Sequence, residues 1–155
     1  MNHIEIQWMV DPSGLPGDEL IHQWVEEALD GYAHDAELVV RVVDKEESAE
    51  LNEQYRHKNG STNVLSFPFE VPEGVSLEVN LLGDLVVCAP VLAEEATEQN
   101  KLLNDHWAHI IVHGVLHLLG FDHIDEIEAE AMESHEIAIL ARLNIQNPYN
   151  EVCES

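Results

Sequence analysis

Short segments with the hydrophobic pattern of β-strands occur four times along the chain. In the first, apolar residues alternate with polar ones, which is the period of a strand with one buried face; they are Ile4, Ile6 and Trp8. Further apolar runs of strand length are residues 37–44, 63–70 and 80–89. Because Pro68 lacks the N–H that a sheet interior needs, its strand is expected at a sheet edge or a bulge.

Apolar residues recur at helical spacing in five longer segments. These segments are residues 18–29, 45–56, 89–100, 104–119 and 125–144. Asp44 is expected to cap the second helix, and Asp125 and Glu128 have the spacing of a capping box before the last. Because strands and helices alternate, the pattern predicts one domain of residues 1–155, of the α+β or α/β class, around a sheet of about four strands.

Two segments stand outside this pattern. Residues 71–80 are the best candidate for a mobile loop, and the acidic tail from about residue 147 is expected to be flexible. The N-terminus lacks the basic and apolar regions of a signal peptide, and no apolar run approaches the roughly 20 residues of a membrane span. The two cysteines, Cys88 and Cys153, lie far apart and indicate no disulfide framework. We therefore expect a cytoplasmic protein.

The charge of the chain is strongly negative. It has 31 acidic residues against 6 Lys and Arg, a formal net charge of −25. Such a charge favours solubility by itself, and it argues against unassisted binding to nucleic acid or to an anionic membrane.

Three histidines close together suggest a metal site. His113 and His117 are four residues apart on the predicted helix 104–119 and therefore share one face. Gly120 is expected to end the helix, so that the chain turns back and brings His123 to the same point. Three neutral imidazoles and a water make an open tetrahedral zinc site of the catalytic type.

Two more histidines lie on the same stripe of this apolar helix. A single histidine on an apolar helix is usually a packed, hydrogen-bonded residue, and this interpretation stays open for His106 and His109. Alternatively, they contact the metal ligands and orient them, or they face the substrate. Asp122 either orients a ligand histidine or stabilises the turn after Gly120. Asp84 is either such a supporting group or an acceptor at a strand end.

Gly114 distinguishes this motif from that of the zinc proteases. Those enzymes have "HExxHxxGxxH", in which the glutamate after the first histidine is the general base. Gly114 stands in place of that glutamate, which disfavours peptide hydrolysis. Glycine within a helix costs about 1 kcal/mol relative to alanine, so it is expected to have a local reason, such as room for a bulky anionic substrate. A water on zinc ionises near pH 7 and could replace the missing base.

Arg56 is the candidate for binding an anionic substrate, since its planar fork matches two phosphate oxygens. The two longest acid-free stretches of the chain are residues 54–69, which contain Arg56, and residues 106–121, which contain the histidines. If the fold brings them together, they form a local basic cleft in a negative molecule. The alternative is that Arg56 makes only a surface contact of little energetic value.

The motif "HGVLHLLGFDH", together with "YRHKNGSTNVLSFPFE" and "LLGDLVVC", resembles the YbeY family of bacterial endoribonucleases and rRNA maturation factors. The resemblance implies an α+β fold with a mixed sheet and a zinc ion held by His113, His117 and His123. It also implies that Arg56 corresponds to the characteristic arginine of the family. Members are cytoplasmic, cleave single-stranded RNA, mature the 3′ end of small-subunit (16S) ribosomal RNA and act in ribosome quality control.

The sequence therefore predicts a zinc-dependent hydrolase of RNA phosphodiester bonds, with Arg56 and His113 as catalytic groups. Whether water or a ribose hydroxyl attacks is left open. Expected partners are single-stranded and ribosomal RNA, with small-subunit ribosomal proteins or assembly factors that help an acidic enzyme reach its substrate; no membrane or DNA partner is expected. The alternative is a metal-stabilised binding module for ribosome assembly without catalysis. A peptidase is the third interpretation, and Gly114 argues against it.

Overall fold

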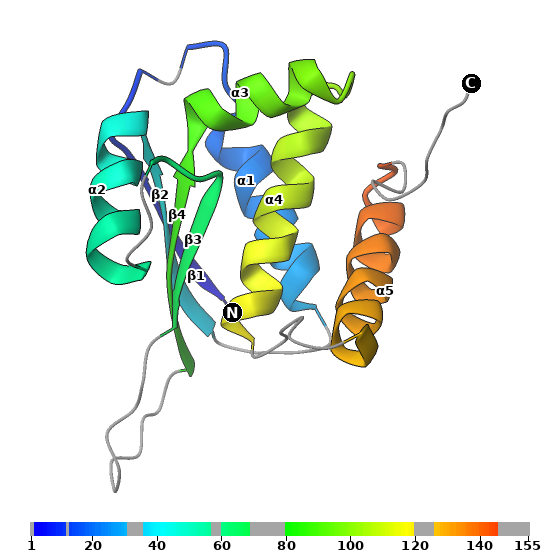
Figure 1. Cartoon of the computed structure of the whole chain (residues 1–155). Helices are drawn as coiled ribbons and strands as arrows, with labels where there is room; N and C mark the ends of the chain where they lie inside the picture. Colours follow the sequence, from blue (N-terminus) through cyan, green and yellow to red (C-terminus); the bar gives the residue numbers. More distant parts are fainter. Residues whose placement is uncertain are drawn as a thin grey trace, which may run out of the picture.

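The computed structural model of the chain describes residues 2–11, 13–30, 36–56, 60–68, 80–119 and 126–145, with the backbone alone at residues 56, 80, 81 and 126–129. Within these ranges, strands and helices alternate in the first part of the chain and three helices follow (Figure 1). The elements are β1 (His3–Trp8), α1 (Asp18–Leu29), β2 (Ala36–Val43), α2 (Lys45–Arg56), β3 (Val64–Pro68), β4 (Asn80–Cys88), α3 (Ala89–Glu98), α4 (Leu103–Leu118) and α5 (Glu126–Arg142).

The four strands form one mixed sheet in the order β1-β2-β4-β3. β1, β2 and β4 are parallel, and β3 pairs with β4 in the antiparallel sense, with Ser66 opposite Leu85 and Pro68 opposite Gly83. β3 is thus an edge strand, where the missing N–H of a proline is tolerated. The predictions of an α+β domain, of a mixed four-stranded sheet and of an edge position for Pro68 are confirmed.

Helices cover the two faces of the sheet unequally (Figure 1). α2 lies on one face, above a small apolar cluster of Val43, Leu65, Val86 and Cys88. α1 and α4 lie on the other face, and α5 packs against these two helices on the side away from the sheet. All three share the main core with β1, β2 and β4. α4 is the central helix of this layer, and apolar residues such as Trp107, Ile111 and Leu116 are fully buried in it. The sheet and the helices around it therefore fix α4 on most of its circumference.

The predicted helices agree closely with the observed ones. α1 and α2 have the predicted bounds, and α4 is displaced by one residue at each end. Asp44 caps α2 as expected, because its Oδ1 accepts a hydrogen bond of 2.9 Å from the backbone N–H of Glu47. Residues 71–79, the Asp125–Glu128 capping box and the tail from 147 fall on parts, or on side chains, that the structure does not describe. Among the helices that are described, none is long and apolar enough to cross a membrane.

Candidate metal centre

Four histidines lie along one stripe of α4, as the helical spacing predicts. The ring centroids of His106 and His109 are 6.2 Å apart, those of His109 and His113 are 6.4 Å apart, and those of His113 and His117 are 4.7 Å apart. The stripe changes from buried to accessible along the helix: the His106 side chain is 3% exposed, and that of His113 is 22% exposed. The end of the stripe that carries the predicted metal ligands is therefore the end that solvent can reach.

His113 and His117 bring two nitrogen donors to one point. Their Nε2 atoms are 3.2 Å apart. Two nitrogens bound to one tetrahedral zinc ion, at bond lengths of about 2.0–2.1 Å, lie about 3.3–3.4 Å from each other. Two neutral imidazoles that both direct a lone pair at this point would repel each other, so a proton or a cation belongs between them. The two residues fit a metal ion.

The third predicted ligand, His123, lies outside the described residues, as do Gly120 and Asp122. Among the described residues, no group of three or more histidine, cysteine, aspartate or glutamate side chains has the geometry to hold a metal ion. The assignment of His123 to the site therefore stays a prediction.

Glu136 of α5 is a buried carboxylate that contacts two of the histidines. Its Oε1 accepts a hydrogen bond from Nε2 of His109 at 3.0 Å, and its Oε2 accepts one from Nδ1 of His113 at 3.3 Å. The residue is 0% exposed. Burial by itself raises the pKa of Glu136, but the hydrogen bonds from His109 and His113, together with the electrostatic effect of the same two rings, outweigh burial and lower the pKa to about 2. Glu136 is therefore an anion at neutral pH.

His106 forms a separate pair with a carboxylate of α3. Its Nε2 lies 2.9 Å from Oε1 of Glu95, and the same carboxylate accepts a hydrogen bond from the side-chain amide of Asn63. Burial lowers the pKa of His106, and the hydrogen bond to Glu95 only partly opposes this. His106 is thus a packed, hydrogen-bonded residue, whereas His109 reaches the carboxylate that also contacts a predicted ligand.

The structure gives a different reason for Gly114 from the one expected. A Cβ atom at this position would lie 2.5 Å from Cδ1 and 2.8 Å from Cδ2 of Leu85, a fully buried residue of β4. The missing side chain thus allows α4 to pack against the sheet, and the expectation that it leaves room for a substrate is wrong. The backbone carbonyl of Gly114 also accepts a hydrogen bond of 3.3 Å from Oγ of Ser66 on β3.

The hydrogen bond between Ser66 and Gly114 is relevant to the predicted basic cleft. It joins β3 to α4, so the two long acid-free stretches of the sequence lie side by side in the fold. Arg56 is the last residue of α2, and the C-terminal ends of α2 and α4 point towards the same end of the molecule (Figure 1). The Arg56 side chain lies outside the described part of the structure, so its phosphate-binding role stays a prediction.

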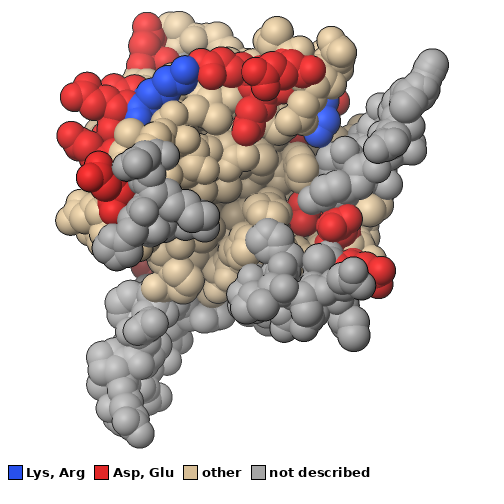
Figure 2. All heavy atoms as spheres, viewed as in Figure 1, with Lys and Arg blue, Asp and Glu red and all other residues tan. Residues whose placement is uncertain are grey.

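Among the described residues, acidic side chains lie along the top, the left and the right of this face of the molecule (Figure 2). They gather over α2, α3 and α5, whereas the central surface between them, over β3 and α4, shows neither acidic nor basic groups. On this face, the negative charge of the described residues is therefore unevenly distributed.

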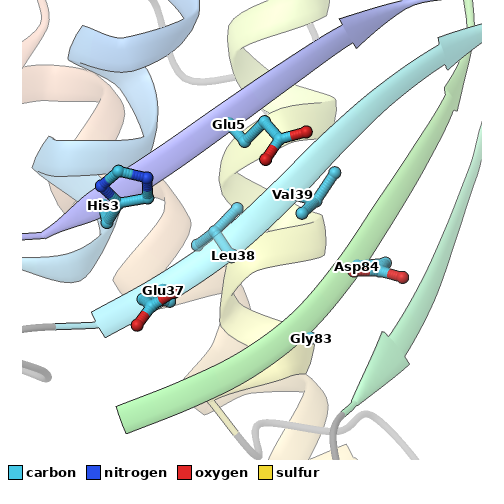
Figure 3. A pocket seen from close by; sticks show the side chains of 7 residues that line it. All are labelled: His3, Glu5, Glu37, Leu38, Val39, Gly83 and Asp84. Carbon is cyan, nitrogen blue, oxygen red and sulfur yellow. The ribbon is translucent and has the colours of Figure 1, made fainter. Parts of the chain in front are cut away.

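Asp84 lies on the opposite face of the sheet from the histidines. Its neighbour in β4, Leu85, points at α4, and successive side chains of a strand point to opposite faces. Asp84 is exposed and lines a shallow hollow with His3, Glu5 and Glu37, on the face that turns away from α4 (Figure 3). A role for Asp84 in supporting the metal ligands is therefore wrong.

Comparisons with known proteins identify relatives over almost the whole chain. A family model described as Endoribonuclease YbeY matches residues 15–144. A protein named Endoribonuclease YbeY from Nitrosococcus oceani is 53% identical over 149 residues, which are 96% of this chain and 97% of that protein. One of the same name from Methylococcus capsulatus is 57% identical over 140 residues, which are 90% of this chain and 91% of that protein.

A solved structure supports the fold. The solution structure of TM1509 from Thermotoga maritima superimposes with a TM-score of 0.58 and covers 98% of this chain and 99% of its own. Its sequence identity of 23% makes this a similarity of fold alone. The sequence relatives, by contrast, are similar enough to show common descent. The segments that match include the histidine motif and the strands around it. The chain therefore belongs to the YbeY family of endoribonucleases.

Proposed function

We propose that this endoribonuclease cleaves single-stranded RNA by zinc-dependent hydrolysis. His113, His117 and His123 hold the ion, and Arg56 binds the phosphate and stabilises the charge that develops on it. Family membership supports RNA as the substrate and cleavage of a phosphodiester bond as the reaction. The zinc dependence and the residue roles are the parts that go beyond it.

One observation carries the proposal: the Nε2 atoms of His113 and His117 are 3.2 Å apart at the accessible end of a buried helix. Because α4 is held by the sheet on one side and by α5 on the other, these donors are fixed before any ion arrives. A zinc ion bound there supplies Lewis acidity for the phosphodiester and makes water a stronger acid. Because Gly114 stands where the zinc proteases have their glutamate, the position after the first ligand supplies no general base.

The net charge of the molecule implies that the attraction for RNA has to come from groups at the site itself. A formal charge of −25 repels a polyanion, and RNA binding normally depends on the neutralisation of phosphates by cations. Arg56 and the ion are therefore expected to supply local attraction, beside a central surface on which Figure 2 shows no acidic group among the described residues. The guanidinium of Arg56 can hold two phosphate oxygens at once.

Further partners follow from the same reasoning. We infer that a small-subunit ribosomal protein or an assembly factor delivers the RNA, because the acidic surface gives the enzyme little affinity for RNA by itself. The biological substrate is then precursor 16S ribosomal RNA near its 3′ end, and the setting is the cytoplasm, where ribosomes are assembled and their quality is controlled.

A cleavage assay with a metal readout tests the proposal. Protein prepared free of contaminating nucleases is analysed for metal content and assayed on single-stranded and duplex RNA, with and without a chelator. We expect one zinc ion per chain, preferential cleavage of the single strand, and loss of cleavage with the chelator. His117→Ala should lose both zinc and at least about 100-fold in rate, whereas His22→Ala on α1, purified identically, should retain both.

The outcomes separate the alternatives. Equal cleavage by His117→Ala and the wild type would reveal a contaminating nuclease and would contradict the proposal. A zinc-loaded, folded wild type without any cleavage would favour a metal-stabilised binding module. The ends of the products decide the chemistry, since a cyclic phosphate excludes direct attack by water and indicates attack by the ribose hydroxyl.

A further inference from the structure

We propose that Glu136 is a positioning residue of the metal site. Its buried carboxylate holds His113 in the orientation and tautomer that direct Nε2 at the ion, and His109 fixes the carboxylate from the other side. The inference rests on the proposed metal-dependent function. It assigns a role to a residue of α5, an element that contributes none of the predicted ligands.

The first argument is the use of both ring nitrogens of His113. Nδ1 lies 3.3 Å from Oε2 of Glu136, and Nε2 lies 3.2 Å from Nε2 of His117. A neutral imidazole has one N–H and one lone pair. A carboxylate only accepts hydrogen bonds, so it draws the N–H to Nδ1 and leaves the lone pair on Nε2. This is the tautomer that a metal ion between His113 and His117 requires.

The second argument is the way in which the carboxylate is fixed. Each oxygen of Glu136 has its own histidine partner, with His109 on Oε1 at 3.0 Å and His113 on Oε2 at 3.3 Å. Rotation of the carboxylate would break both contacts. His109 stands one turn before His113 on α4, so the three side chains form a rigid link between α4 and α5. The ring of His113 therefore has little freedom to turn away from the ion.

The third argument is electrostatic. Glu136 is 0% exposed, and a buried carboxylate is unfavourable unless hydrogen bonds and positive charge compensate it. The negative charge behind His113 makes its ring a stronger donor, as outer carboxylates do for metal-bound histidines. A cation at Nε2 in turn stabilises the buried anion. The ion and Glu136 are thus expected to stabilise each other through one imidazole.

The same helix provides a matched control. Glu95 pairs with His106 at 2.9 Å, much as Glu136 pairs with His109. Glu95 belongs to α3, and it contacts the side chains of His106 and Asn63, neither of which is a predicted ligand. Replacement of either glutamate by glutamine removes a carboxylate from a histidine of α4. Only Glu136→Gln removes it from a predicted ligand, and the amide of the new side chain could donate to Nδ1 of His113 and move the N–H to Nε2.

The test measures zinc affinity, not activity. Full-length wild type, Glu136→Gln and Glu95→Gln are titrated with zinc against a chromogenic chelator at one pH, and circular dichroism checks that each is folded. We expect zinc binding to weaken about 10- to 100-fold in Glu136→Gln and to be unchanged within error in Glu95→Gln. Glu136→Asp, which keeps the charge but shortens the reach, should fall between the wild type and Glu136→Gln.

A measurement on the wild type covers the case in which the variants do not fold. Long-range ¹H–¹⁵N spectra of the histidine rings should show the N–H of His113 on Nδ1, and zinc should perturb Nε2. An N–H on Nε2 would overturn the inference. Tight zinc binding by the wild type with equal affinity in Glu136→Gln would overturn the inference and leave the metal site intact. A wild type that binds no zinc would overturn the proposed metal dependence and the inference with it.

Discussion

At the scale of single residues, the environment of a histidine on α4 is determined by the carboxylate that it contacts. Glu136 is completely enclosed, whereas the side chain of Glu95 is 26% exposed. His106 is itself buried, and burial lowers its pKa more than Glu95 raises it, with further lowering by Lys101 and His109. The neutral form of His106 is therefore the form that the fold accommodates.

This pKa predicts a contribution to acid sensitivity. The pKa of His106 in the folded protein is below the value of about 6.5 that an unfolded chain has, so the unfolded state binds its proton first as the pH falls. Stability is then fully present above pH 6.5 and decreases below it, by at most about 1.4 kcal/mol per pH unit. We expect His106→Gln, which keeps a hydrogen-bonding group for Glu95, to lose less stability than the wild type between pH 7.5 and 5, as chemical denaturation in metal-free buffer will measure.

The control for this prediction is His22→Gln on α1, which removes a histidine from another part of the molecule and should follow the wild-type profile. The acidic residues of the chain contribute equally to all three proteins and cancel in the comparison. Parallel pH profiles of the wild type and His106→Gln would contradict the argument, because they would mean that His106 titrates alike in the folded and unfolded states.

At the scale of elements, the packing of α4 on β4 depends on one position. An alanine at 114 would gain about 1 kcal/mol in helix propensity over glycine, but its Cβ would lie 2.5 Å from Cδ1 of Leu85, so this fully buried side chain would have to shift. Overpacking of a core costs about 1–3 kcal/mol. We expect Gly114→Ala to lower the free energy of unfolding by about 1–2 kcal/mol, measured by urea denaturation.

A double-mutant cycle isolates the contact between the two residues. Leu85→Ala alone should cost about 2–5 kcal/mol because it leaves a cavity, and Gly114→Ala should cost less in that background than in the wild type. Additive costs would contradict a direct clash. A stable Gly114→Ala with a raised KM for RNA would instead restore the idea that the glycine makes room for the substrate.

The elements could be predicted from the sequence because their signals are local. The alternation of Ile4, Ile6 and Trp8 and the helical period of residues 18–29 lie within the segments that they specify. The histidine stripe could be predicted for the same reason, since His113 and His117 belong to one helix whose geometry fixes their spacing. These features depend on neighbours in the chain and not on tertiary contacts.

Glu136 and the reason for Gly114 could not be predicted in this way. Glu136 is 23 residues from His113 in the chain, and α5 contains several glutamates that the sequence does not distinguish. Only the packing of α5 on α4 shows that Glu136 is buried. The clash with Leu85 likewise depends on how closely α4 approaches the sheet. Both facts belong to the contacts between elements, for which a single sequence gives no period or spacing.

At the scale of the whole molecule, the net negative charge of the enzyme opposes the binding of its negatively charged substrate. The substrate is a polyanion, and the enzyme has a formal charge of −25. Among the described residues, acidic groups gather over α2, α3 and α5 on the face that Figure 2 shows. The long-range field therefore repels RNA, while the proposed ion and Arg56 attract it at short range. Salt screens the first effect at lower concentrations than the second, because screening acts most on charges separated by more than a Debye length.

This opposition predicts an unusual salt dependence. As ionic strength rises from about 0.01 to 0.15 M, the Debye length falls from about 30 to 8 Å, so we expect kcat/KM for a short single-stranded RNA to rise several-fold. Reversal of two exposed acidic residues on different helices, Glu50→Lys and Glu98→Lys, should raise the low-salt rate and flatten the curve without any new contact at the site. A steady fall of the wild-type rate with salt, as phosphate neutralisation by a basic protein produces, would contradict the prediction, because the field near the site would then be attractive in spite of the net charge.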